Sequence, residues 1–333
     1  MSRCVLIESM SLRRIGLPPA LGLLLLSVLW AINSLRRELF LRPGANILPH
    51  AQSEAALFSV FALVAACVAY MQRMEFPRGR YAWACAGVGI GLFVVPAALL
   101  ACAEGELSML DRVAVFSLTP VFAVVLEPHL QGSVPSRGKA ALGAALVAVA
   151  GILCVFPLAI PGSFRAGMAL FALLMASFVI AAANCIAVRL AVSFARRSIL
   201  PLAALAAGAS AICFAAAAAF VPHNAWRWNE LSSSLLSLLL IDSPALFLLF
   251  WLLPRLAASR MTARFLLAPL ITLLAGMALE APSLSLRAWL GIILLAGGAG
   301  WLVFAPAERT EVEGLGLKHA LTADSPRRPP LDD

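Results

Sequence analysis

The sequence predicts an all-α polytopic membrane protein with ten transmembrane helices, arranged as two inverted five-helix repeats. Composition is the first observation: 62% of the 333 residues are hydrophobic and 13% are charged, whereas soluble domains are about half apolar and about a quarter charged. The second is a series of long apolar segments with short connections. The third is a correspondence between the two halves of the chain. No globular core of this length could hide so much apolar surface, so lipid must solvate the chain.

The apolar segments define the helices, because a hydrocarbon layer about 30 Å thick needs roughly 20 apolar residues per helix. The predicted spans are about 16–35, 54–71, 81–102, 108–127, 138–158, 167–189, 199–221, 233–253, 261–280 and 286–306. We interpret the first as a retained helix rather than a signal peptide, since it lacks an obvious small-residue cleavage site. Residues 1–15 are predicted to form a cytoplasmic segment. The polar tail 307–333 is predicted to be disordered and cytoplasmic.

The positions of the basic residues predict the orientation. The N-terminal segment and the four loops on its side carry twice as many as the opposite loops, fourteen against seven. The fourteen are Arg3, Arg13, Arg14, Arg73, Arg78, Arg80, Arg137, Lys139, Arg189, Arg196, Arg197, Arg255, Arg260 and Arg264. This excess predicts that both termini are cytoplasmic. The net charge of +8 therefore indicates topology, and we predict no nucleic-acid partner. High alanine and arginine with few lysines favours a GC-rich bacterial genome, hence the bacterial inner membrane.

The two halves of the chain correspond at a nearly constant offset. Pro96 matches Pro244 at an offset of 148, and Pro120 matches Pro269 at 149. The Leu-Gly pair at 142–143 recurs at 290–291. Each half, 16–158 and 159–306, holds five predicted helices. Because five is odd, the second half enters the membrane from the opposite side, which is the inverted repeat that many secondary transporters share.

Specific motifs in both halves resemble the EamA family of the drug/metabolite transporter (DMT) superfamily. They are Trp30 and Asn33 in "VLWAINSLRR", the stretch "LTPVFAVVLEPHLQG" of the first half, and "LAPLITLLAGMALEAPSLSLRAWLGIILLAGG" of the second. The resemblance implies ten helices in two five-helix repeats. In one departure, the helix-end glutamate of the family is Glu280 in the second half, whereas the first-half position is Gln131. Glu127 lies one turn earlier.

Asp242 is the strongest candidate for a substrate-binding or proton-coupling residue. It lies about ten residues into the predicted eighth span, where a charge is costly and usually faces a cavity or a partner. Pro244 follows and interrupts the helical hydrogen bonds. The alternative is a packing role, with Asp242 hydrogen-bonded to a neighbouring helix. Asn33 and Asn184, late in the first helix of each half, are further candidates, with interfacial positions as their alternative.

Prolines inside the spans predict helix breaks. Pro96, Pro120, Pro244 and Pro269 pair across the two halves, so we expect them to shape a central cavity rather than only to bend single helices. Ser117 and Thr119 lie beside Pro120 and are predicted to line that cavity.

Charged residues near the outer ends of spans are candidates for a gate. Glu104, Asp111 and Arg112 precede or open the fourth span, and Glu280 ends the ninth. Solvated loop ends are the alternative.

Glycines predict close helix contacts, namely Gly87 and Gly91 at GxxxG spacing and the "AGGAG" stretch at 296–300.

These features predict a secondary transporter, not an enzyme, that moves a small metabolite or drug-like molecule by alternating access, with the proton as a candidate coupling ion. We expect neither a cofactor nor a metal, since the seven cysteines show no metal-ligand spacing and no nucleotide-binding motif occurs. A monomer and a homodimer both remain open. Two other classes also remain open: an intramembrane enzyme acting on lipid-linked substrates, and a non-transporting scaffold or sensor.

Overall fold

The structure is a computed structural model that describes residues 18–39, 50–103, 105–131, 138–158, 162–194, 199–220, 238–280 and 285–304. The chain separates into two units, Met1–Val303 and Phe304–Asp333. The predicted segments 1–15 and 307–333 lie outside the described residues, and everything below concerns the first unit.

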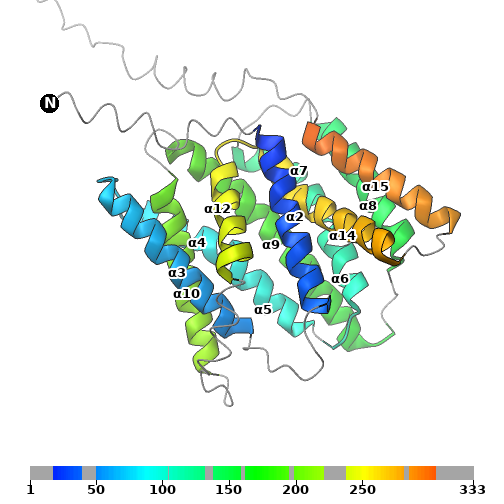
Figure 1. Ribbon diagram of the computed structural model, residues 1–333, viewed down its shortest axis with the longest axis horizontal. Coiled ribbons are helices and arrows are strands. Elements are labelled where there is room, and N and C mark those ends of the chain that lie inside the picture. The colour runs from blue at the N-terminus through cyan, green and yellow to red at the C-terminus, as the bar shows by residue number, and fades with distance from the viewer. Residues whose placement is uncertain are drawn as a thin grey trace, which may run out of the picture. The chain divides into compact units, whose positions relative to one another are not determined.

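Every element in the described residues is a helix (Figure 1). The first half contains α2 (Pro19–Leu39), α3 (His50–Met71), α4 (Arg80–Gly89), η1 (Ile90–Val94), α5 (Val95–Cys102), α6 (Met109–Phe116), α7 (Thr119–Gln131) and α8 (Gly138–Val155). The second contains α9 (Phe164–Phe194), α10 (Leu200–Ala219), η3 (Leu238–Asp242), α12 (Ser243–Leu252), α13 (Ala258–Thr262), α14 (Arg264–Glu280) and α15 (Leu286–Phe304).

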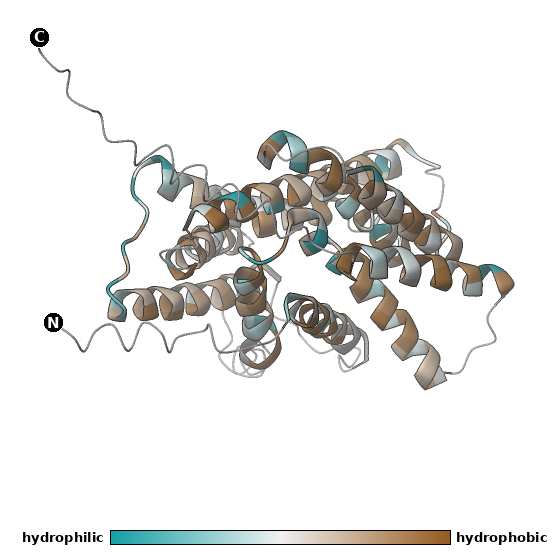
Figure 2. Cartoon of the chain, turned by 90° about the horizontal axis from the view of Figure 1, so that it is seen from above, coloured by the Kyte–Doolittle hydropathy of each residue, from teal (hydrophilic) through white to brown (hydrophobic). Residues whose placement is uncertain are grey.

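The helices have the length and composition of membrane spans. Eight helical segments in the described residues are long and apolar enough to cross a membrane, and they coincide with eight of the ten predicted spans. The other two predicted spans correspond to shorter apolar helices, Pro19–Asn33 and Leu240–Leu252. Hydrophobic residues predominate along the helices (Figure 2). The prediction of an all-helical polytopic membrane protein is confirmed.

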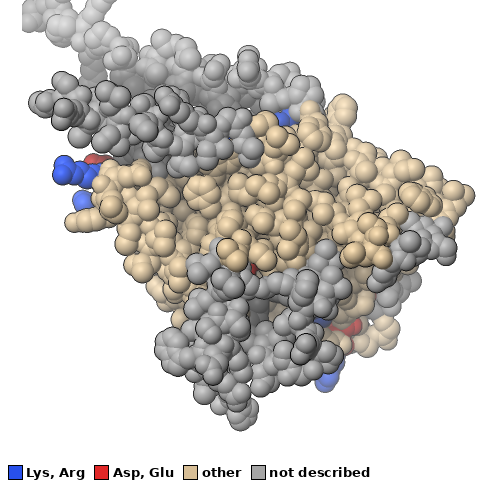
Figure 3. Space-filling model, in the orientation of Figure 1, with Lys and Arg blue, Asp and Glu red and all other residues tan. Residues whose placement is uncertain are grey.

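The surface agrees with lipid as the solvent. Large apolar side chains stand fully outside the packed interior, for example Trp83 (79% exposed), Phe164 (83%) and Ile212 (72%). In Figure 3 most of the described surface on this face is uncharged, and the charged side chains gather towards its margins. In water such a surface would be strongly unfavourable, whereas in hydrocarbon it is not.

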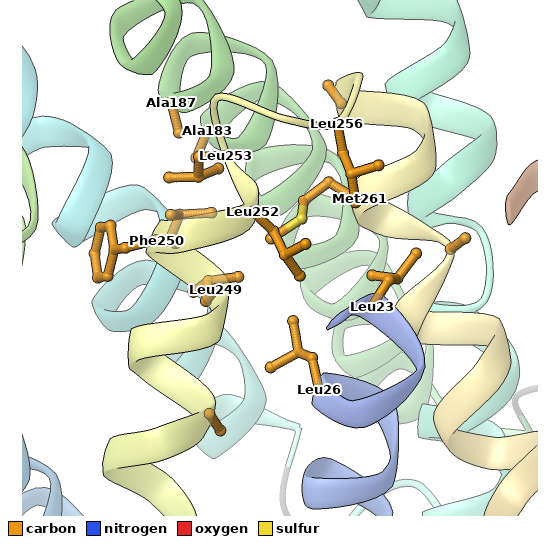
Figure 4. Packing of buried hydrophobic residues seen from close by; sticks show 14 of the residues in the cluster. Leu23, Leu26, Ala183, Ala187, Leu249, Phe250, Leu252, Leu253, Leu256 and Met261 are labelled. Carbon is orange, nitrogen blue, oxygen red and sulfur yellow. The ribbon is translucent and has the colours of Figure 1, made fainter. Parts of the chain in front are cut away.

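The interior is packed from leucines on one helix and small residues on another. Leu249, Phe250 and Leu252 of α12 are buried together with Leu26 of α2. Figure 4 shows Leu252 lying towards α2 and the chain end of α12 lying against the alanines of α9. Alanines let helix backbones approach closely in lipid, where van der Waals packing replaces the hydrophobic effect between helices.

Glycine makes the closest helix contacts. A Cβ added at Gly89 would lie 2.0 Å from the carbonyl oxygen of Ala206, so α4 and α10 touch backbone to backbone. A Cβ added at Gly298, in the "AGGAG" stretch, would lie 2.5 Å from the carbonyl oxygen of Ala144 and 2.7 Å from the backbone nitrogen of Ala148 in α8. The predicted contact at Gly87 is wrong, because nothing lies within 4 Å of that position. The predicted contact at Gly91 is present, because a Cβ added there would lie 3.1 Å from the Cβ of Ala183 in α9. The contact with α10 is made by Gly89, which lies between the two predicted glycines.

The first helix of each half packs against the other half. Helix α2 contacts α12 and α14, whereas α9 contacts α5 and α7, and α2 lies between α12 and α14 in Figure 1. Helices α3 and α10 pack against each other. The first helix of each half therefore packs among helices of the other half.

Two π-helices interrupt the spans that contain Pro96 and Pro244. Helix η1 precedes α5, and η3 precedes α12; each has five residues, and a proline occupies the second position of the α-helix that follows. A proline ring clashes with the carbonyl four residues earlier and removes one N–H donor. The wider π turn relieves this crowding, and such turns often occur at functional sites.

Candidate functional site

Asn33 and Asp242 form a polar pair between α2 and the end of η3. Asn33 Nδ2 donates a hydrogen bond to Asp242 Oδ1 at 2.9 Å, across 209 positions of sequence. Both side chains are half-buried. Two residues that the sequence proposed separately thus contact each other, at the point where the π-helix gives way to α12.

Asn184 and Arg264 form a second polar pair between α9 and α14. Asn184 is fully buried; its Nδ2 donates to the carbonyl of Ile180 at 2.8 Å, and its Oδ1 accepts from Arg264 Nη1 at 3.3 Å. The topology count placed Arg264 among the loop arginines. This placement is wrong, because Arg264 is 2% exposed and opens α14, inside the ninth span.

Arg264 is a buried cation with few acceptors. Its Nη1 also donates to the carbonyl of Met261 at 3.1 Å, while its Nε is buried with no hydrogen-bond partner. In the part of the chain that the structure describes, no carboxylate lies within ion-pair distance of it. Burying a charge without a counterion is costly. Arg264 is therefore expected to destabilise the fold, and its presence suggests a functional role.

Aromatic rings supply part of the compensation. The guanidinium carbon of Arg264 lies 4.9 Å from the ring centroid of Trp30 and 5.0 Å from that of Phe265, within the range of cation–π attraction. Trp30 meets Phe265 edge to face at 5.5 Å, and Phe265 stacks on Phe116 at 6.3 Å. Rings of two helices, α2 and α14, therefore contact the cation, and Phe116 of α6 packs against one of them.

Helix α2 joins the two polar pairs. Trp30 contacts Arg264, and Asn33 contacts Asp242. Residues three apart in a helix are neighbours on its surface. The predicted residues Asn33, Asn184 and Asp242 therefore belong to one set of contacts, together with Arg264.

Ser117 and Thr119 have a different position from the one predicted for cavity-lining residues. Both are fully buried, and their hydroxyls donate to carbonyls of their own segment, to Ala114 at 2.6 Å and to Phe116 at 2.7 Å. These bonds satisfy carbonyls at the break between α6 and α7. Both hydroxyls thus hydrogen-bond within their own segment, next to Phe116.

The predicted prolines fall into two groups. Pro96, Pro120 and Pro244 each occupy the second position of a helix that follows a break. Pro269 lies inside α14, and the interruption of the ninth span falls earlier, at Ala263 between α13 and α14.

The predicted gate residues do not form a described cluster. Asp111 is buried and caps α6: its carboxylate accepts from Ser108 N–H at 3.2 Å and from Ser108 Oγ at 2.6 Å. Arg112 is half-buried, with a buried Nε that has no acceptor. Glu104 and the side chain of Glu280 lie outside the described residues.

Glu127, which lies one turn before the position of the expected helix-end glutamate, connects α7 to α13. Its Oε1 and Oε2 accept from the backbone N–H groups of Ala258 and Ser259, at 3.1 and 3.3 Å. A carboxylate of α7 therefore caps the start of α13, 131 positions away. The carboxylate also complements the positive end of the helix.

Two signals could have found Arg264 and the rings around it. Arg264 lies inside the predicted span 261–280, so it did not need to be a loop residue. Phe116 and Phe265 differ by 149 positions, the same offset at which Pro120 matches Pro269 in the sequence. Among the described residues, no group of three His, Cys, Asp or Glu side chains is placed to hold a metal ion.

Comparisons with known proteins report on the fold. No family model matches the sequence, and no curated protein matches it. Among solved structures 27 chains match. One, described only as a crystal structure of a protein, has a TM-score of 0.64 and 18% sequence identity, with 88% of this chain and 98% of that chain covered. At this identity the likeness concerns the fold alone.

Proposed function

We propose that the protein is a secondary transporter of the EamA type, which moves a small metabolite or drug-like molecule across a bacterial inner membrane by alternating access. The proposal includes ten transmembrane helices in two inverted five-helix repeats, with both termini in the cytoplasm. The observation that carries it is the reciprocal packing of the halves: α2 contacts α12 and α14, and α9 contacts α5 and α7.

Matching elements support the repeat. The π-helices begin at Ile90 and Leu238, an offset of 148. The fourth and ninth spans, Met109–Leu130 and Ala258–Leu279, both have 22 residues and begin at an offset of 149. Each is interrupted once, before Thr119 in one and at Ala263 in the other, although the breaks differ in position by three to four residues. The matching π-helices and span boundaries are expected if the halves share one architecture.

Two similar halves with opposite orientation can exchange conformations. When each half adopts the conformation of the other, a site between them opens to the opposite side of the membrane. The helix breaks supply local weak points for this exchange, because they interrupt the ladder of helical hydrogen bonds. The polar contacts that connect α2, α9, η3 and α14 are the candidate binding site between the halves.

Exchange across a lipid bilayer tests the proposal without knowledge of the substrate. Proteoliposomes preloaded with unlabelled bacterial metabolite extract are incubated with the same extract labelled with carbon-13, and the vesicle contents are analysed by mass spectrometry. We expect labelled molecules of one chemical class to enter only vesicles that contain the protein. Entry equal to that of protein-free vesicles would contradict transport and favour a scaffold, and a chemically altered labelled product would favour an enzyme.

A further inference from the structure

We propose that Arg264 binds an anionic group of the transported molecule, so that the ligand is a small organic oxyanion with a flat apolar part. This inference rests on the proposed transport function for the statement that the ligand is cargo. The binding itself rests on the surroundings of Arg264.

The unused part of the guanidinium is the first argument. Both hydrogen bonds of Arg264 use Nη1, to Asn184 and to Met261, and Nε is buried without an acceptor. A guanidinium binds a carboxylate or phosphate through two parallel N–H groups. The Nε–H group is therefore a buried donor without an acceptor, and an oxyanion could satisfy it.

The missing counterion is the second argument. Arg264 is 2% exposed, and the described residues place no carboxylate beside it. The carboxylate of Asp242 instead accepts a hydrogen bond from Asn33. An anionic ligand would supply a counterion for the guanidinium. Binding would therefore reduce the free-energy cost of burying this charge.

The matching sequence position of the first half carries no cation. The residue 149 positions before Arg264 is Val115, which is buried at 2% exposure, near the break between α6 and α7. An apolar side chain therefore fills the corresponding place. A purely structural role does not explain why one half carries arginine and the other valine.

The surrounding rings indicate the rest of the ligand. Trp30 and Phe265 flank the guanidinium, and Phe116 extends the aromatic surface. A planar apolar group attached to the oxyanion could stack on these rings, with the contact energy of an aromatic pair. The chemistry shared by aromatic carboxylates and aromatic phosphates fits this description.

Thermal unfolding of the detergent-purified full chain tests this inference. Phenylacetate and phenyl phosphate are the anionic probes, and phenylacetamide is the neutral control of the same shape. A ligand that binds the folded state raises its unfolding temperature. We expect one or both anions to stabilise the wild type and the amide to have no effect, and the two anions distinguish a carboxylate ligand from a phosphate ligand.

Variants assign the effect to Arg264. Arg264→Gln should lower probe affinity about tenfold to a hundredfold, the size expected for a lost charge-assisted hydrogen bond. Arg264→Lys keeps the charge without the two-pronged geometry and should weaken binding less; it remains informative if the glutamine variant does not fold. Arg255→Gln is the matched control, because Arg255 also lies over a tryptophan, 4.1 Å from the Trp251 ring, but is exposed. This variant should bind like the wild type.

Three results would overturn the inference: no stabilisation of the wild type by either anion, equal stabilisation by the amide, or unchanged binding in Arg264→Gln. The binding measurement is independent of transport. Exchange in proteoliposomes without anion binding would remove only this inference, whereas anion binding without exchange would remove the proposed function.

Discussion

Phe116 and Phe265 stack on each other, with 6.3 Å between ring centroids and 18° between ring planes, although 149 positions separate them. Phe116 ends α6, and Phe265 is the second residue of α14, so each lies beside a helix break. If the halves are related by a two-fold axis, only residues close to that axis can contact their own counterparts. The pair then marks the place where the halves meet.

The phenylalanine pair predicts an energetic coupling. In a double-mutant cycle with Phe116→Leu and Phe265→Leu, the two effects on the free energy of unfolding should differ from additivity by about 0.5–1.5 kcal/mol, the value of an aromatic pair beyond its buried area. Denaturant titration in detergent measures it. The control cycle joins Phe116→Leu with Phe58→Leu, whose ring contacts Phe93 and Phe214 instead. Additivity within about 0.5 kcal/mol in both cycles would contradict the coupling.

The contact between Asn33 and Asp242 predicts opposite outcomes for two substitutions. Asp242→Asn keeps an oxygen that accepts from Asn33 Nδ2, so the free energy of unfolding should change little. Asp242→Leu removes this acceptor of the half-buried Asn33 Nδ2, and the loss of the hydrogen bond should cost about 1–3 kcal/mol. Thermal unfolding compares the two, with Val94→Leu, at the end of η1, as the control. A leucine variant more stable than the wild type would show that the aspartate does not stabilise this contact.

The contact of Glu127 with α13 predicts a local effect. Glu127→Ala removes both acceptors from the N–H groups of Ala258 and Ser259, and the loss of a helix cap costs about 0.5–2 kcal/mol. Hydrogen exchange should then quicken at these two amides, while the distant helix α3 keeps its protection. Glu127→Gln, which retains one acceptor oxygen, should have a smaller effect. Unchanged exchange at both amides in the alanine variant would exclude the cap.

Two glycines of α4 predict contrasting responses to the same substitution. Gly89→Ala places a methyl group against the backbone of Ala206 and should destabilise the fold by about 1–3 kcal/mol, as overpacking does. Gly87→Ala meets nothing within 4 Å and should be neutral or stabilising by up to about 1 kcal/mol, because alanine favours the helix. The unfolding temperatures of the two variants are compared directly. Equal temperatures would contradict the close contact of α4 and α10.

Local chemistry explains why much of the fold could be predicted. Apolar length decides where a helix can cross lipid, and Pro96 and Pro244 interrupt hydrogen bonds wherever they occur. The five-residue π-helices before them could not be predicted, because nothing in "IGLFV" or "LLLID" distinguishes a π turn from an α turn. Gly89 was missed in favour of Gly87 for a similar reason, since spacing does not say which face of α4 meets α10.

The polar site was only partly predictable, because its contacts are distant in sequence. Asn33, Asn184 and Asp242 were identified as polar residues in apolar surroundings, but not their partners, which lie 209 and 80 positions away. Arg264 was counted as a loop residue because the topology rule treats arginines near span ends as interfacial. Its burial follows from the packing of α9 and α2 around the start of α14, which a single sequence does not reveal.

Of the two π-helices in the described residues, η3 carries a charge and η1 does not. Helix η3 ends in Asp242 and η1 ends in Val94, and the residue 149 positions before Arg264 is Val115. A molecule with two equal halves would work alike whichever way up it were inserted. If the halves are inverted repeats, as proposed, insertion the other way up would not give an equivalent molecule, because Asp242 and Arg264 both belong to the second half and the matching positions of the first half are valines.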